Sequence, residues 1–392
     1  MKTLFSFKRS RIRIAVVCAV AISAVFPASA QSSFEQDYIF WGYPTAYLNY
    51  EAKVAYPLID KMLQTYPPKK KINNNRQLAL IALDQFLHDA QYNKRDAFYS
   101  FAQGRFSLVP EILKQPVTTG VRVIKLYNSG FILKTRNTAV AVDFVPGVTA
   151  SQPFITDEAV NAIIDGCDAL LITNGDAGYV NSDIAFEFAA KGKKVIVPTG
   201  VLTNLGGMVQ TVGADDRVSI QLSGLTLHVL PGHNGNDKNN IYIMDFNGNG
   251  IVAHTGAQSN EDDWFWIDLL HNQYNTDILL TKSQNINIES MLLGFMPRLV
   301  ITAHENEMES TVDKRESYWA TQKRMKDLAR LNIPNVIMTW GETYDYDNTK
   351  TADNGYTETD NNFSSARKVL LNGVIYIERK GSIYTTTGTK VK

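Results

Sequence analysis

The chain has 392 residues, of which 44% are hydrophobic and 20% are charged, with 39 basic and 39 acidic residues. This composition is ordinary for a globular protein, and the sequence holds no repeat and no low-complexity linker. Without the first thirty residues the charge is 34 basic against 39 acidic residues, which argues against nucleic acid or an anionic membrane surface as the main partner.

The first thirty residues have the pattern of a cleavable signal peptide. Five basic residues and no acidic one precede an apolar run from Ile14 to Phe26. Ala28-Ser29-Ala30, just after the run, resembles a cleavage site. The run is shorter than the about 20 residues that span a membrane. We therefore expect a periplasmic or secreted protein whose mature chain starts at Gln31, with an uncleaved N-terminal anchor as the alternative. Cleavage leaves 34 basic against 39 acidic residues.

A single cysteine, Cys167, would remain in the mature chain. One cysteine excludes an internal disulfide. Its position directly before an apolar strand favours a buried structural thiol over a nucleophile.

Residues 31–116 are predicted to form a helical N-terminal arm. Apolar residues recur at helical spacing from Glu51 to Tyr66 and again from Arg76 to Ala90. Pro67-Pro68 ends the first of these helices. We expect this arm to pack on a domain formed by residues 117–392.

Short strands begin near residue 117. Val121–Leu126, Phe131–Thr135 and Ala139–Phe144 read as a meander, and the apolar run Ala169–Thr173 reads as a buried strand. Turn residues predict two later hairpins, at Ser223-Gly224 and around Asn247-Gly248-Asn249. We expect a polar surface loop over Asn234–Asn240, and a calcium site there is the weaker alternative. A long helix is expected over Asp313–Leu331. A C-terminal β extension is expected over Lys368–Glu378 and Ser382–Thr386.

Strands that alternate with helices, together with hairpins, indicate a layered α/β sandwich. Several strand ends resemble those of the metallo-β-lactamase superfamily in their order and spacing. They are Tyr127–Phe131, Val142–Phe144, Ala169–Thr173, Leu230–His233, Ala253–Ala257 and Ile301–His304. The resemblance covers about residues 120–340. It implies a four-layer αβ/βα sandwich with one cleft at the strand ends, lined by Asn174, Asp176, Tyr179, His233, His254 and His304.

The sequence departs from this family at the metal-binding motif. Active members carry T-H-x-H-x-D-H after the buried strand, where imidazoles and carboxylates hold two zinc ions. Here the segment from Thr173 to Tyr179 reads T-N-G-D-A-G-Y, and Ala257 stands where the resemblance implies a bridging Asp. Neither metal position keeps the three good ligands that a catalytic zinc requires. We expect no cofactor and no pair of zinc ions.

Two functions stay open at this point. The first is a non-catalytic or catalytically altered protein of the cell envelope that binds a small polar ligand or a protein partner in the former metal cleft. The second is a hydrolase that holds a single zinc through Asp176, His233 and His304. The retained histidines also have a plain structural interpretation, as groups hydrogen-bonded to their neighbours.

Overall fold

The computed structural model describes residues 44–147, 153–213, 216–285 and 287–348, and the strands 366–371, 374–379 and 382–385. The predicted signal peptide lies outside the described residues. The chain divides into two compact units, one ending at Asn348 and one starting at Thr349.

The first unit holds two mixed seven-stranded sheets. The first sheet has the order β14-β1-β2-β3-β4-β5-β6 and the second the order β13-β12-β11-β10-β9-β8-β7. The first consists of β1 (Val121–Lys125), β2 (Phe131–Lys134), β3 (Ala139–Val142), β4 (Ala169–Leu171), β5 (Lys194–Pro198), β6 (Gln210–Val212) and β14 (Thr343–Tyr346). The second consists of β7 (Val218–Leu222), β8 (Leu225–Asn234), β9 (Asp237–Asp245), β10 (Ile251–His254), β11 (Ile278–Lys282), β12 (Leu299–Ala303) and β13 (Asn335–Val336).

Each sheet joins an antiparallel half to a parallel half. The strands from β14 to β3 pair antiparallel and those from β3 to β6 pair parallel. In the second sheet, β7 to β10 pair antiparallel and β10 to β13 parallel. The predicted meander and both predicted hairpins are therefore confirmed.

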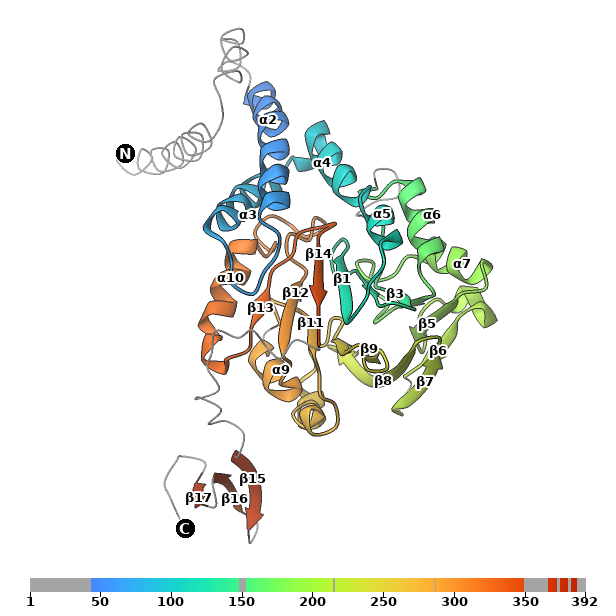
Figure 1. Ribbon diagram of the computed structural model, residues 1–392, viewed down its shortest axis with the longest axis vertical. Coiled ribbons are helices and arrows are strands. Elements are labelled where there is room, and N and C mark those ends of the chain that lie inside the picture. The colour runs from blue at the N-terminus through green and yellow to red at the C-terminus, as the bar shows by residue number, and fades with distance from the viewer. Residues whose placement is uncertain are drawn as a thin grey trace, which may run out of the picture. The chain divides into compact units, whose positions relative to one another are not determined.

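Helices cover the outer faces of both sheets (Figure 1). The first sheet is covered by α2 (Pro44–Thr65), α3 (Asn74–Leu87), α4 (Asp96–Phe106), α5 (Val109–Lys114), α6 (Asp157–Gly166) and α7 (Ser182–Ala190). The second is covered by α8 (Trp264–Ile267), α9 (Ile288–Phe295) and α10 (Tyr318–Asp327). Short 3-10 turns complete the unit: η4 (Tyr92–Lys94), η5 (Thr203–Met208), η6 (Glu261–Asp263), η7 (Leu270–Asn272) and η8 (Ala329–Leu331).

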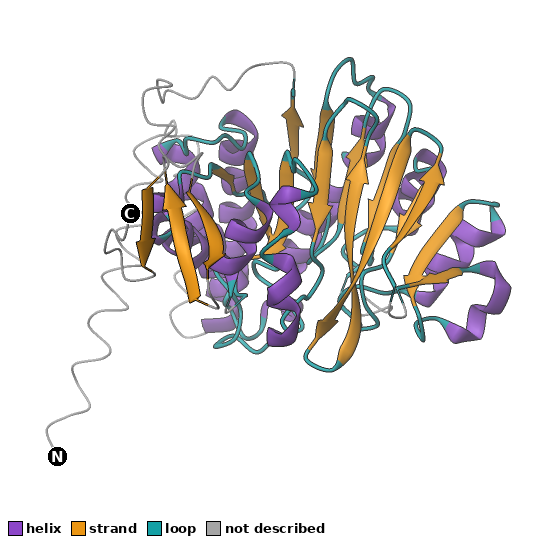
Figure 2. Ribbon diagram, turned by 90° about the horizontal axis from the view of Figure 1, so that it is seen from below, coloured by secondary structure: helices purple, strands orange, loops and turns teal. Residues whose placement is uncertain are grey.

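Three apolar cores separate these layers. One core lies between the sheets and contains side chains from both, such as Val123 and Leu280. A second lies between the first sheet and its helices, and a third between the second sheet and α8 to α10. The four-layer αβ/βα sandwich expected from the resemblance is thus confirmed, and Figure 2 shows the strands running between the two helical layers.

Side-chain caps set the start of several helices. Asn181 accepts a hydrogen bond from the backbone N–H of Ile184 at 2.9 Å, and Ser317 accepts one from the backbone N–H of Ala320 at 3.0 Å. Such caps satisfy backbone N–H groups that the first helical turn leaves free. Because Ser317 is the cap, α10 begins only at Tyr318. The helix predicted over Asp313–Leu331 was therefore wrong for the residues before Tyr318.

The predicted polar loop Asn234–Asn240 is also wrong. Residues 225–234 and 237–245 form the long hairpin of β8 and β9, in which Gly232 pairs with Asn239 and Asn234 with Asp237. Asn239 and Asn240 are fully buried. Their side chains make hydrogen bonds inside the protein, so a polar stretch that resembles a loop in the sequence forms a strand.

The second unit contains a three-stranded antiparallel sheet. Its strands are β15 (Ala366–Leu371), β16 (Val374–Arg379) and β17 (Ser382–Thr385), with β16 in the centre. They agree with the predicted C-terminal β extension. Within the described ranges, no helix combines the length and apolar character needed to cross a bilayer.

Candidate functional site

The six residues predicted to line one cleft all lie at or just after strand ends. Asn174, Asp176 and Tyr179 follow β4, His233 lies near the end of β8, His254 ends β10, and His304 follows β12. Asn174, Tyr179, His254 and His304 are buried, whereas Asp176 is exposed and His233 is about one-third exposed. The positions therefore divide into an interior group and an edge group.

Tyr179 and His304 contact each other directly in the interior group. The Tyr179 hydroxyl is hydrogen-bonded to Nε2 of His304. Nδ1 of His304 faces Oε2 of Glu307 at 3.6 Å, too long for a direct hydrogen bond. Burial lowers the pKa of His304 to about 4, so the ring is neutral at pH 7. The carboxylate nearest Nδ1 favours the tautomer with its proton there, in which Tyr179 donates to Nε2.

Asn128 and Glu307 fill the space beside Gly178. The Asn128 amide donates to the Gly178 carbonyl and to Oε1 of Glu307, both at 3.2 Å. A Cβ atom added at Gly178 would lie 2.4 Å from Nδ2 of Asn128. Burial acts to raise the pKa of Glu307, but His304, Lys282 and Asn128 together lower it to about 2. Any side chain at position 178, including the aspartate that the resemblance implies for active members, would therefore require the Asn128 amide to shift.

His254 is held as part of the protein interior. The Gly256 N–H donates to Nδ1 of His254 at 3.0 Å, so the ring proton is on Nε2, which donates to the Ser129 carbonyl at 3.0 Å. Burial lowers its pKa to about 3. Both ring nitrogens are used, and this histidine offers nothing to a ligand in this arrangement.

Asp143 supports the strand that leads into Asn174. Its carboxyl accepts hydrogen bonds from the backbone N–H and the hydroxyl of Thr173 at 2.8 Å. Oδ2 also lies 3.8 Å from Nε2 of His254. Burial raises the pKa of Asp143 to about 8, although the bonds from Thr173 act to lower it. This residue fixes the position of the β4 end relative to β3.

Asn239 occupies the interior between Asn174 and Ala257. Oδ1 of Asn239 accepts from the Ala257 N–H at 2.9 Å and from Nδ2 of Asn174 at 3.4 Å. Its Nδ2 donates to the Thr255 carbonyl at 3.0 Å and toward Oε1 of Gln258 at 3.4 Å. The side chain is fully buried. An amide therefore stands between the positions at which the resemblance implies metal ligands.

The amide chain continues to His233. Oε1 of Gln258 accepts from the backbone N–H of His233 at 2.9 Å, and Nε2 of Gln258 donates to Oδ2 of Asp263 at 2.7 Å. Asp263 in turn lies 3.1 Å from Nδ1 of His233 and accepts from the Trp266 indole at 3.1 Å. The chain thus runs Asn174, Asn239, Gln258, Asp263, His233.

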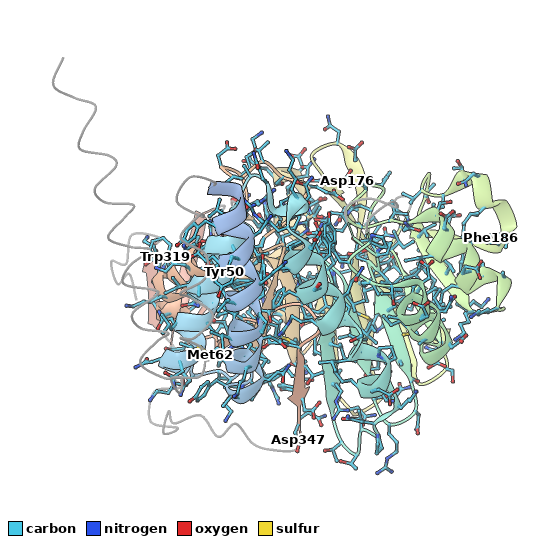
Figure 3. The ribbon with its side chains drawn as sticks, turned by 90° about the horizontal axis from the view of Figure 1, so that it is seen from above. Tyr50, Met62, Asp176, Phe186, Trp319 and Asp347 are labelled. Atoms are coloured by element: carbon cyan, nitrogen blue, oxygen red, sulfur yellow. The ribbon has the colours of Figure 1, made fainter. Side chains whose placement is uncertain are left out.

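Asp176 belongs to the exposed edge of the site. Oδ2 accepts a hydrogen bond from Nδ2 of Asn234 at 3.0 Å, and Oδ1 of Asn234 accepts from the Ser259 hydroxyl at 2.9 Å. Asp176 is exposed, and Figure 3 labels it near the upper margin of the first unit. Polar groups from the segment after β4, the end of β8 and the segment after β10 therefore meet at this edge.

The residues present do not fit a catalytic metal. Among the described residues, no three side chains of His, Cys, Asp or Glu lie together as a group that could hold one ion. The predicted single-zinc set of Asp176, His233 and His304 therefore does not come together. Each of these side chains instead faces a protein partner, respectively Asn234, Asp263 and Tyr179.

Five residues that hold this site together were not among the residues predicted to line the cleft: Asn128, Asn239, Gln258, Asp263 and Glu307. Two of them had a visible signal. Glu307 lies three residues after His304, and Asn239 is in the Asn-rich stretch that was assigned to a loop. Asn128, Gln258 and Asp263 reach the site only through the tertiary fold.

Comparisons with known proteins concern the fold. No protein-family model and no curated protein matches the sequence. A metallo hydrolase from the archaeon Ignicoccus hospitalis is 19% identical, with a TM-score of 0.46 over 59% of this chain and 99% of that one. An isothiocyanate hydrolase from Delia radicum gut bacteria is 10% identical, with a TM-score of 0.44 over 57% and 99%.

A diiron β-hydroxylase from Streptomyces venezuelae is 14% identical, with a TM-score of 0.45 over 59% of this chain and 55% of that one. The neighbours thus include metal-dependent hydrolases and a diiron enzyme. Such identities and scores describe a likeness of fold and carry nothing about activity.

Proposed function

We propose that this chain is a metal-independent protein of the metallo-β-lactamase fold that binds a small polar organic molecule at the exposed edge of the site. The observation that carries this proposal is the set of internal hydrogen bonds across the former metal positions. Tyr179 is bonded to His304, and Asn239 links Asn174 to Ala257. The first bond occupies Nε2 of His304, and the Asn239 amide fills the space between Asn174 and Ala257.

The chemistry of the edge supports a polar ligand. Asp176 is exposed and supplies a carboxylate, His233 supplies a ring nitrogen, and Ser259 supplies a hydroxyl. Nε2 of His233 has no hydrogen-bond partner among the described residues. A ligand with both donors and acceptors could bond to all three groups, because their hydrogen-bonding capacity is mixed.

The single-zinc hydrolase is less well supported. It requires Asp176, His233 and His304 to converge on one ion, and such a group is missing from the described part of the chain. Bringing them together would break the bonds from Asp176 to Asn234 and from His304 to Tyr179. A cell-envelope location belongs to the proposal as well, and the predicted leader is its only support.

Metal analysis and thermal unfolding of the mature protein test the proposal. We expect less than stoichiometric zinc after purification and no change in melting temperature on adding zinc or EDTA, because a metal that does not bind the native state cannot stabilise it. Two tightly held metals per chain, or a zinc-dependent rise in melting temperature that His233→Ala removes, would contradict it.

A thermal-shift screen of polar metabolites then addresses the ligand. A genuine ligand should raise the melting temperature of the wild type but not that of Asp176→Ala. Asp157→Ala is the matched control, since Asp157 is an exposed aspartate at the start of α6. A shift that both variants retain would place the ligand elsewhere.

A further inference from the structure

We propose that His233 and Asp263 form a metal-independent acid–base pair in which Nε2 of His233 accepts protons at the exposed edge of the site. The inference rests on the proposed metal-free site and goes beyond binding. It gives the edge a catalytic capacity that needs only water as co-reactant.

The hydrogen-bond pattern fixes the tautomer of His233. Oε1 of Gln258 is used as an acceptor by the His233 backbone N–H, so Nε2 of Gln258 is the end that donates to Asp263. Asp263 also accepts from the Trp266 indole, which is a donor only. Both Asp263 oxygens therefore serve as acceptors, so Nδ1 of His233 carries the ring proton and donates to Oδ2 at 3.1 Å.

This tautomer leaves the lone pair of Nε2 unused. The His233 side chain is 32% exposed and that of Asp263 only 8% exposed. A buried carboxylate behind an accessible imidazole holds the ring in place and stabilises the imidazolium that forms when Nε2 takes up a proton. The arrangement is therefore suited to general-base and general-acid catalysis.

No other histidine of the chain has this combination. All six histidines lie in the described ranges. His88 and His271 face backbone carbonyls, His228 faces the Ser219 hydroxyl, His254 uses both ring nitrogens, and His304 is buried against Tyr179. His233 alone pairs one ring nitrogen with a buried carboxylate within hydrogen-bond distance while its side chain stays about one-third exposed.

The substrate class follows from what the pair can supply. With no metal to polarise a carbonyl, the pair suits an ester with a good leaving group. Nε2 takes a proton from water while the water oxygen forms a bond to the acyl carbon. The bond from that carbon to the leaving oxygen then breaks, and the imidazolium returns the proton to it. One acid and one alcohol form, and His233 ends neutral.

Hydrolysis of p-nitrophenyl acetate by the mature protein in EDTA-containing buffer tests the pair. We expect His233→Gln to lower kcat/KM by about ten-fold or more, within the range of general-base effects. Asp263→Asn should lower kcat with KM unchanged, since Asp263 does not touch the ester. His228→Gln is the control, because His228 lies on the same strand and is bonded to Ser219.

A tautomer measurement separates this role from a structural one. Nitrogen NMR of histidine-labelled protein should show the His233 proton on Nδ1 in the wild type and a shift toward Nε2 in Asp263→Asn. Equal hydrolysis by wild type, His233→Gln and His228→Gln would overturn the inference, as would a wild-type rate no higher than buffer. An unchanged tautomer in Asp263→Asn would overturn the role of Asp263.

The results that would overturn the acid–base pair can be told apart from those that would overturn the proposed metal-free binding site. Zinc-dependent stabilisation or zinc-dependent hydrolysis would contradict the metal-free site itself. Loss of hydrolysis in His233→Gln with no effect of zinc on wild-type melting supports both. Absence of hydrolysis with no zinc effect removes the acid–base pair and leaves the binding proposal in place.

Discussion

Arg76 on α3 and Glu342, directly before β14, form a two-pronged ion pair inside the protein. Nη1 lies 2.7 Å from Oε1 and Nη2 lies 2.6 Å from Oε2, with the two side chains 1% and 8% exposed. Arg105 on α4 adds a second guanidinium 3.6 Å from Glu342. The helices before β1 are therefore fastened to the first sheet by buried charges.

Breaking this pair should destabilise the protein strongly. We expect Arg76→Ala to lower the free energy of unfolding by about 3–5 kcal/mol. The buried Glu342 carboxylate then loses both hydrogen bonds from Arg76 and keeps only the more distant Arg105 as a charged partner. Urea unfolding measures the change. Lys323→Ala is the control: the pair of Lys323 with Asp327 is exposed and should contribute less than about 1 kcal/mol. Equal effects of both substitutions would contradict the expectation.

The space beside Gly178 gives a second prediction. Gly178→Ala should cost about 1–3 kcal/mol of stability, because the new Cβ atom meets the Asn128 amide. Gly104→Ala in α4, where a Cβ meets nothing within 4 Å, should instead be neutral or stabilising. Adding Asn128→Gly should restore part of the loss, since Asn128 has a φ of 53° that glycine adopts freely. No rescue in the double variant would show that the clash lies elsewhere.

The amide of Asn239 gives a third prediction. Asn239→Ala leaves the N–H of Ala257 buried without its acceptor, and we expect a loss of about 1–3 kcal/mol in the free energy of unfolding. Asn204→Ala removes an exposed amide and should change stability by less than about 0.5 kcal/mol. Chemical denaturation of the two variants in parallel measures both changes. A loss in Asn239→Ala no larger than that in Asn204→Ala would contradict a structural role for the Asn239 amide.

His254 should make the protein sensitive to acid. Its pKa is about 3 when folded, against the usual 6.5 when unfolded. Between pH 3 and pH 6.5 the His254 ring is protonated in the unfolded chain but not in the folded protein. The free energy of unfolding therefore rises with pH in this range and falls on acidification, by at most about 1.4 kcal/mol per pH unit. His304, with a pKa of about 4, acts in the same direction.

His254→Gln isolates this contribution. Glutamine can still donate to the Ser129 carbonyl but cannot take up a proton near neutral pH. The free energy of unfolding should therefore rise less steeply between about pH 4.5 and 6.5 in the variant than in the wild type. The His304 contribution is common to both proteins and cancels in the comparison. Identical slopes would mean that His254 does not titrate on unfolding.

The sequence predicts most of the sandwich because strand and turn signals are local. The meander from Val121 and the hairpin at Ser223-Gly224 follow from apolar alternation and turn residues alone. The start of α10 follows only in part from the local cap at Ser317, since Asp84 of α3 also accepts from the N–H groups of Tyr318 and Trp319, at 2.8 and 2.9 Å. That partner is distant in the sequence.

The site was predictable only in part, for the same reason. The strand ends that carry Tyr179, His233 and His304 were identified, because the resemblance places them. Whether all six predicted residues share one ligand-binding cleft stays a prediction. Asn239 was missed because a buried polar strand residue resembles a loop residue until its hydrogen-bond partners are known.

The filled space beside Gly178 has a consequence for protein engineering. Introducing the histidines and aspartate of the T-H-x-H-x-D-H motif into the segment from Thr173 to Tyr179 would not by itself create a metal centre. Asn128 would have to leave room for an aspartate, and Asn239 would have to release Ala257. These residues come from four separate stretches of chain, so any redesign must change them together rather than one at a time.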